Sequence, residues 1–565
     1  MSRSGVLSRR QIEGLIANKQ SIVIFDGKVL RLDKWLERHP GGKLPIQHMV
    51  GRDATDEIKI YHSLETFPRM DSFRIGYIEG PWVNFEPPIS GGIFRPYEGE
   101  PNMRKCAKTI TTTLCPSKTS TLPETDGICN KRASPPPCPK LADENPLVLS
   151  NLQDKMDVNG LVTGTLDKFP RSCTQVEFMD LAEQLEIDSD VGRFPSVDPA
   201  TQGTIISKYR QLHQSVQDNG HYECRYIEYG KECVRYLSIF ALCMVALKYE
   251  WYMTSAMLLG LFWHQIMFTA HDAGHLAITH NYIADTLIGI FIADFCCGLS
   301  IGWWKSSHNV HHLVPNHPVH DPDIQNVPLF ANSPMFFQSI RSSYYNFDFA
   351  WDRACEVAIK FQKYTYYPVM GIARFNLYLL SWLHLISPRA SNKGTAAWTR
   401  PTEMLFMACY WYLFGYRLLW LTLPTWTIRV AFVLVSHIIT MPLHVQITLS
   451  HWGMSTADLG ATESFAQKQL RTTMDVDCPA WLDFIHGGLQ FQAVHHLFPR
   501  VPRHNLRRVQ ALVREFCKDV GIEYTIFGFV DGNKVVLSRL GDIAKQVEIM
   551  VACQKHNVET GDMSI

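Results

Sequence analysis

Long apolar stretches separated by polar segments occupy the last two-thirds of the chain. The longest uncharged run is Trp251–His271, which matches the roughly 20 residues that a membrane-spanning helix requires. Met404–Tyr416 and Val430–Ser450 are further predicted spans. Tyr236–Leu247 is shorter, but basic residues flank it, and their long side chains can reach the membrane surface. The pattern therefore predicts a mostly α-helical membrane domain with about four transmembrane helices.

The front of the chain has short apolar runs and polar turns instead. Ile22–Phe25 and Lys28–Leu32 are predicted strands on either side of Asp26-Gly27, which is a hairpin turn signal. A polar helix is predicted over Asp53–His62. Residues 1–82 are therefore expected to form a compact α+β domain.

Composition divides the remainder of the chain. Residues 83–170 are rich in Pro, Ser and Thr and predict a linker that cannot bury a core. Residues 171–225 regain helical periodicity and predict an amphipathic helical lead-in. The membrane domain is expected at 226–530, and residues 531–565 are expected to form a C-terminal tail. Four Cys in the linker lack the close pairing that a zinc site needs.

Charge and composition narrow the class of protein. The 565 residues have a formal net charge of zero, so no global field attracts nucleic acid. The aromatic content is 12%, including 14 Trp, which is typical of a protein with a membrane-interface belt. Several of the 15 Cys lie inside apolar runs. They indicate buried thiols in a reducing compartment and not a disulfide framework.

Three histidine-rich clusters lie at the edges of apolar stretches. A helix brings positions i, i+3 and i+4 onto one face, and imidazole is a good ligand for iron. A single His on an apolar helix is more often a core residue, but three clusters in one chain predict a cage for more than one metal ion. The clusters are His271-Asp-Ala-Gly-His275, His308-Asn-Val-His311-His312 and Gln492-Ala-Val-His495-His496.

Eight cluster positions do not complete two coordination spheres, so further ligands are expected. His451, directly after the last predicted span, is the first choice. His444 and His264 lie deeper in apolar helices and are expected to pack there, whereas His317 and His320 are expected in a loop. Neighbouring polar side chains are expected to orient the ring N–H groups, namely Asp272, Asn309, Asp321 and Asp323.

A second metal-binding motif lies in the N-terminal domain. His39-Pro-Gly-Gly42, followed by Asp53-Ala-Thr-Asp56 and Tyr61-His62, resembles cytochrome b5 over roughly residues 8–82. Two His from opposing elements can clamp a haem iron from both sides, and such a haem moves electrons because no position is open to oxygen. His39 and His62 are the predicted haem ligands. His48 lies between them, and the resemblance favours His62.

The predicted haem domain indicates which metal the histidine cage holds. Zinc has no redox role, so a haem beside the cage favours iron. If the three clusters share one site, they lie on one side of the membrane, and the number of crossings between consecutive clusters is even. Tyr282–Trp304 and Tyr367–Ile386 are therefore predicted to be interfacial or re-entrant. Both chain ends are then on the same side as the clusters.

Together the motifs resemble the membrane-bound desaturases of the cytochrome b5-fusion, front-end type, over about residues 1–82 and 205–530. The stretches 51–62, 302–305 and 487–505 most resemble fungal sphingolipid Δ8-desaturases. The resemblance implies a di-iron, oxygen-dependent oxidoreductase that inserts a Δ8 double bond, of trans geometry, into the long-chain base of a ceramide. It implies no catalytic residue beyond the metal ligands.

The resemblance also implies cofactors, partners and location. These are haem b, two iron ions, O2 as co-substrate, NADH-cytochrome b5 reductase as electron donor, and ceramide taken from the bilayer. The protein is expected in the endoplasmic reticulum membrane, with both termini cytosolic and no nucleic-acid partner. Trp303, Trp304 and Phe491 are expected to line an apolar substrate tunnel or to pack in the core.

Three alternatives share parts of this pattern. A front-end Δ5 or Δ6 acyl-lipid desaturase has the same cage and haem, and a lipid hydroxylase can use the same scaffold. A non-catalytic haem carrier with a membrane anchor needs no cage, so the three clusters argue against it.

Overall fold

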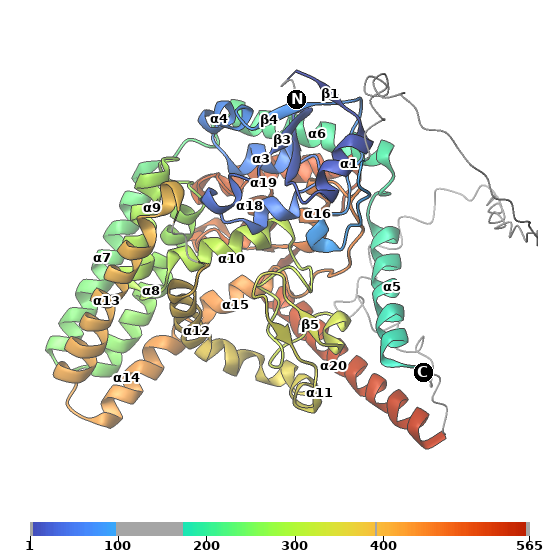
Figure 1. Ribbon diagram of the computed structural model, residues 1–565. Helices are drawn as coiled ribbons and strands as arrows, with labels where there is room; N and C mark the ends of the chain where they lie inside the picture. Colours follow the sequence, from blue (N-terminus) through green and yellow to red (C-terminus); the bar gives the residue numbers. More distant parts are fainter. Residues whose placement is uncertain (1–3, 98–172, 390–392, 561–565) are drawn as a thin grey trace, which may run out of the picture. The chain divides into compact units, whose positions relative to one another are not determined.

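The computed structural model describes residues 4–97, 173–389 and 393–560 (Figure 1). The predicted linker at 83–170 lies for the most part outside these residues. Contacts within the chain separate residues 97–157 from a unit of residues 1–96 and 158–565. The elements described below all belong to the second of these units.

Residues 4–96 form an α+β module that extends beyond the predicted 1–82, because Phe85 and Phe94 of the predicted linker pack against its buried cluster. β2 (Ile22–Phe25) and β3 (Lys28–Arg31) are antiparallel, as predicted. Asp26 and Gly27 between them both have positive φ, as a two-residue type I′ hairpin turn requires. β4 (Arg74–Ile78) pairs with β3 and, in parallel, with β1 (Val6–Leu7). The helices of the module are α1 (Arg9–Ala17), α2 (Leu44–His48), α3 (Thr55–Tyr61) and α4 (Phe67–Asp71).

Two helices form the predicted amphipathic lead-in, α5 (Gln175–Arg193) and α6 (Pro199–Asp218). Thr174 begins α5 with a capping box, and Asp198 accepts from two backbone N–H groups at the start of α6. The apolar face of α6 packs against α19 (Arg503–Val520) in one buried cluster with α18 (Gln492–Leu497). The lead-in thus supports the helix that carries the third histidine cluster.

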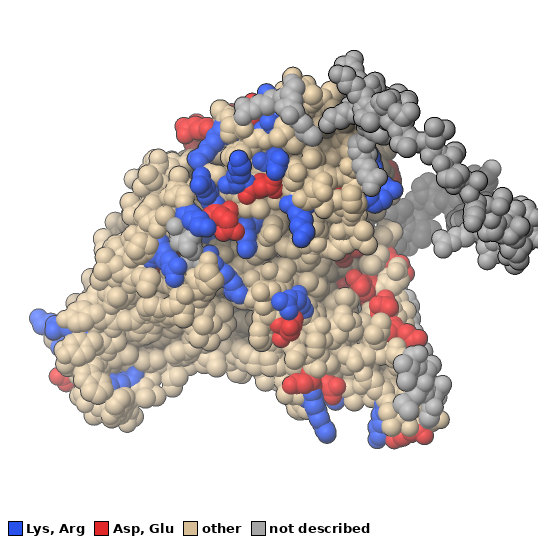
Figure 2. Space-filling view, viewed as in Figure 1, with Lys and Arg blue, Asp and Glu red and all other residues tan. Residues whose placement is uncertain are grey.

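Long helices form the apolar part of the unit (Figure 1). α8 (Tyr252–Gly274) packs against both α7 (Tyr226–Lys248) and α14 (Trp426–Ile438). Buried Trp263 of α8 contacts the aromatic rings of Phe414 and His437. Figure 2 shows few charges on the surface over α7, α13 and α14 except near their free ends. That distribution is typical of helices whose middle faces lipid.

Three helical segments of the described ranges are long and apolar enough to cross a membrane. They are α12 (Gln362–Ile386), 394–422 with α13 (Thr399–Tyr410) and η9 (Trp411–Thr422), and 426–449 with α14 and α15 (Met441–Leu449). The last two contain predicted spans, but α12 contains a segment predicted to be interfacial. α7 and α8, which hold the other predicted spans, fall short because residues such as Glu232, His264 and Gln265 lower their mean hydropathy. The three segments therefore include two of the four predicted spans and one segment that was predicted to be interfacial.

The predicted re-entrant segment is sharply bent. α9 (Tyr282–Ile290) and η6 (Phe291–Cys296) meet α10 (Ile301–Leu313) at 117°. The carboxylate of Glu403 accepts from the Ser300 hydroxyl at 2.5 Å and the Gly302 N–H at 2.9 Å, which caps α10 at its N-terminus. Glycine at position 302 leaves room for this carboxylate, because a Cβ there would lie 2.5 Å from Glu403. The bend directs α10, with the second histidine cluster, back along the end of α8.

The C-terminal third of the chain packs against the long helices. The segment predicted as a tail lies mostly in α20, a 32-residue helix that packs against α11 and α12. The remaining elements are α11 (Arg353–Lys360), α16 (Phe465–Thr472), α17 (Asp483–His486), α20 (Phe529–Thr560), β5 (Ile340–Arg341), β6 (Asp348–Phe349), β7 (Asp475–Asp477) and β8 (Ile526–Gly528).

Candidate functional site

The fold gathers the predicted metal ligands from four parts of the chain. They come from the end of α8, from α10, from the second residue after α15 and from α18. The possible ligand atoms of one group lie within 4.8 Å of one another, and so do those of a second group. The groups are His271, His275, His308 and His495, and His311, His451 and His496. Each of these groups has enough imidazoles to hold a metal ion.

Two further predicted ligands lie beside these groups. The His312 ring stacks on His496 with ring centres 4.1 Å apart, and its Nε2 lies 3.0 Å from Nε2 of His308. Gln492 is buried and lines the same cavity as His308. Asp323, expected only to orient a ring, forms a third possible ligand group with His308 and His311.

Hydrogen bonds fix the orientation of individual rings. Nδ1 of His311 lies 2.8 Å from the Asp321 carboxylate, and Nδ1 of His496 lies 2.8 Å from Oε1 of Gln469. The opposite ring nitrogen of His496 is buried and has no hydrogen-bond partner among the described residues. The same holds for Nε2 of three other members of the cage, His271, His275 and His495. Buried polar atoms normally have partners, so these lone pairs fit a metal ion.

The protonation state also suits a metal. Burial, together with the neighbouring imidazoles, holds the pKa of His495 and His496 well below the usual value. The same causes lower the pKa of His451. A neutral imidazole has a free lone pair, whereas a protonated one cannot bind a cation. These side chains are therefore neutral ligands at physiological pH.

Sequence reasoning missed Gln469 on α16. Its side chain accepts from His496 and donates from Nε2 to the His312 carbonyl oxygen at 2.8 Å, so it connects two clusters. Nothing in the local sequence distinguishes it from Gln467 on the same helix. Of the predicted orienting residues, Asp321 contacts a ring as expected, whereas Asn309 lies against Gly41 of the N-terminal module.

Replacing Gln469 by Met should lower iron occupancy, because His496 loses the partner that orients its ring. Loss of such a partner typically lowers metal affinity about 10–100-fold. The iron-to-haem ratio of the purified protein measures the effect. Gln467→Met is a matched control, since Gln467 is equally buried but bonds to Gln202 and the Pro195 carbonyl oxygen. Equal iron in both variants would contradict the role assigned to Gln469.

The predicted haem ligands face each other in the N-terminal module. The ring centres of His39 and His62 are 6.0 Å apart. Two imidazoles on opposite sides of one ion, each bonded at about 2 Å, have ring centres roughly 6 Å apart. Nδ1 of each ring bonds a backbone carbonyl oxygen, that of Gly42 or Ile58, which leaves Nε2 for iron. The pair therefore fits bis-His haem ligation.

Protonation and position separate the haem pair from the third histidine of the module. Burial lowers the pKa of His62 to about 4 and also lowers the pKa of His39, so both rings are neutral. His48 points elsewhere, with its ring centre 5.0 Å from that of His320. The structure thus pairs His39 with His62, the residue that the sequence favoured. His264 and His444 belong to neither metal group.

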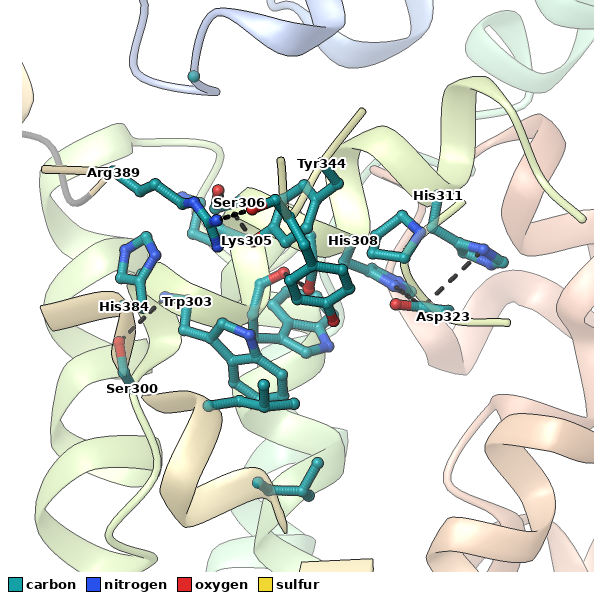
Figure 3. Close-up of a pocket in the computed structure, with 18 of the residues that line it drawn as sticks. Ser300, Trp303, Lys305, Ser306, His308, His311, Asp323, Tyr344, His384 and Arg389 are labelled. Carbon is teal, nitrogen blue, oxygen red and sulfur yellow. Dashed lines mark hydrogen bonds and ion pairs between the residues drawn. The ribbon is translucent and has the colours of Figure 1, made fainter. Parts of the chain in front are cut away.

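A cavity of about 1670 Å³ opens beside the metal ligands (Figure 3). Much of its wall is apolar, and His271, His308 and His451 line it. Trp303 and Trp304 line it, and Phe491 packs in the buried cluster around α19, so the two expected alternatives both occur. Polar side chains line one side of the part shown in Figure 3, including Lys305, Tyr344, His384 and Arg389. The arrangement suits a long apolar ligand with a polar end.

Comparisons with known proteins agree with both the haem-type histidine pair and the histidine cage. Residues 8–79 match the cytochrome b5-like heme/steroid binding domain family, and residues 250–528 match the fatty acid desaturase family. A Delta 8-(E)-sphingolipid desaturase of Emericella nidulans is 48% identical over 564 residues, which is 100% of this chain and 99% of the relative.

Other relatives show how the similarity is distributed. A Delta 8-(E)-sphingolipid desaturase of Candida albicans is 43% identical and covers 98% of each chain. A Delta(8)-fatty-acid desaturase of Helianthus annuus is 40% identical over 296 residues, 52% of this chain and 63% of the relative. Similarity over the whole length is thus found with the fungal proteins.

Proposed function

The chain belongs to the fatty acid desaturases that carry a cytochrome b5-like domain, and from this premise we propose that it inserts a trans Δ8 double bond into the long-chain base of a ceramide. It uses two iron ions and O2, with electrons from its own haem. The observation that carries the proposal is two groups of closely spaced imidazoles at the wall of an apolar cavity, with a haem-type histidine pair in the same unit.

The chemistry explains why these parts occur together. Desaturation removes two hydrogen atoms from adjacent carbons while O2, two electrons and two protons become two molecules of water. Iron held by the imidazoles supplies the dioxygen chemistry that an unactivated C–H bond requires. The His39–His62 pair leaves no open haem position, so that site delivers single electrons. His311 and His496 keep their rings in place through Asp321 and Gln469.

The substrate assignment rests on the relatives and on the cavity. Relatives similar over the whole chain are named Delta 8-(E)-sphingolipid desaturases. The apolar wall suits the alkyl chain, and the polar groups at Lys305, Tyr344 and Arg389 suit the amide and hydroxyl groups of a ceramide. We place the protein in the endoplasmic reticulum membrane, with cytosolic termini and an NADH-cytochrome b5 reductase as its electron donor.

Expression in a host whose ceramides lack a Δ8 double bond tests the proposal. We expect ceramides with a new trans Δ8 double bond in the long-chain base, measured by mass spectrometry and by double-bond derivatisation. New double bonds only in acyl chains would point to a Δ5 or Δ6 acyl-lipid desaturase instead. Hydroxylated lipid without alkene would point to a hydroxylase. Either result would overturn the assignment.

A further inference from the structure

α10 forms a wall between the N-terminal module and the metal ligands. Its histidines belong to the cage, while Val310, Leu313 and Val314 are buried in the same apolar cluster as Ile46 and Met49 of the module. A helix with its side chains is about 10–12 Å across. The haem-type pair and the cage are therefore separated by little more than this one helix.

Tyr61 of the N-terminal module contacts α10. It directly precedes His62, and its hydroxyl donates to the backbone carbonyl oxygen of His312 at 3.3 Å. Its ring lies edge-on to the His312 ring, with centres 6.2 Å apart and planes at 81°. One predicted haem ligand is thus joined to one predicted metal ligand by the chain from His62 to Tyr61 and a single hydrogen bond.

Other contacts hold the module in this position. The Arg210 guanidinium on α6 bonds the Asp56 carboxylate of the module at 2.7 Å. The Asn84 side-chain amide donates to the Ala461 carbonyl oxygen at 3.1 Å. A Cβ on Gly41 would lie 3.4 Å from the Asn309 side chain of α10. The module therefore contacts the rest of the unit at several points besides Tyr61.

We propose that Tyr61 is a positioning residue for electron transfer, providing the path from the haem at His62 to the metal pair at His312. This inference rests on the proposed function. Each electron oxidises one ferrous haem to ferric haem and reduces one ferric ion of the cage to ferrous. Electron tunnelling weakens less along bonds and hydrogen bonds than across gaps between atoms. The Tyr61 hydroxyl provides such a bonded route, and no proton leaves it.

Tyr61→Phe tests the route in the full-length protein. The haem is reduced chemically, and the protein is then mixed with ceramide in a solution that contains O2. The Soret band follows the reoxidation of the haem. We expect reoxidation several-fold slower than in the unmodified protein, and slower again in Tyr61→Leu, which also lacks the ring. The haem midpoint potential, the haem spectrum and the iron-to-haem ratio should stay unchanged in Tyr61→Phe.

Tyr77→Phe is the matched control. It removes a hydroxyl of the same module that accepts from Arg74 Nη1 at 2.7 Å, on a strand that pairs with β1 and β3. We expect reoxidation at the unmodified rate. An unmodified rate in Tyr61→Phe would overturn the inference, and so would a slower rate accompanied by an altered haem potential or lost iron. If ceramide and iron do not accelerate haem reoxidation in the unmodified protein, the proposed function itself fails.

Discussion

Loss of desaturation with an intact haem spectrum is the expected result of His311→Ala. His311 contributes to the second ligand group and is held by Asp321 in a buried position. Its removal leaves only two imidazoles in the group, and it takes from the buried Asp321 carboxylate the one ring that this carboxylate orients, so metal affinity should fall. We expect no product above background, reduced iron per haem, and an unchanged Soret band.

His264→Ala provides the control for His311→Ala. His264 is also a buried histidine, but it belongs to neither ligand group. Its loss should leave iron bound. Product formation by His311→Ala with a full complement of iron would refute the cage as the catalytic centre.

The second large effect is expected at His62. His62→Ala should lose haem, because one ring of the facing pair is removed and His39 alone leaves the other side of the iron open. Electron supply, and with it desaturation, should then be lost. The Soret band of the reduced protein and the haem content after extraction measure the result.

His48→Ala is the matched variant for His62→Ala. His48 is a histidine of the same module and is more deeply buried than His62, but its ring faces His320. We expect normal haem content. Haem lost from His48→Ala and kept in His62→Ala would exchange the roles of the two residues.

Features set by neighbouring residues could be predicted from the sequence. The hairpin at Asp26-Gly27 depends on two adjacent residues that tolerate positive φ. The histidine clusters depend on helical spacing, which is fixed over one turn. The pairing of His39 with His62 was implied by the resemblance of the surrounding motif to cytochrome b5, and not by spacing.

Membrane placement was harder to predict. α12 was expected to be interfacial because its segment contains Arg374, yet its length and composition permit a span. In the structure the Arg374 guanidinium bonds the Tyr378 hydroxyl and the Cys297 carbonyl oxygen, and it is fully buried. Tyr378 lies one turn further along α12, but Cys297 follows η6 and is 77 residues away in the chain, so the local pattern does not reveal this second partner.

The sequence by itself determined the ligand types, their spacing on each helix, and the presence of a haem module ahead of an apolar domain. Only the tertiary structure decided which histidines share a group, that Gln469 orients His496, and that α10 separates the module from the cage. The physical reason is range. Spacing on one helix follows from the backbone, whereas contacts such as Tyr61 with His312 join residues far apart in the chain and depend on how whole elements pack.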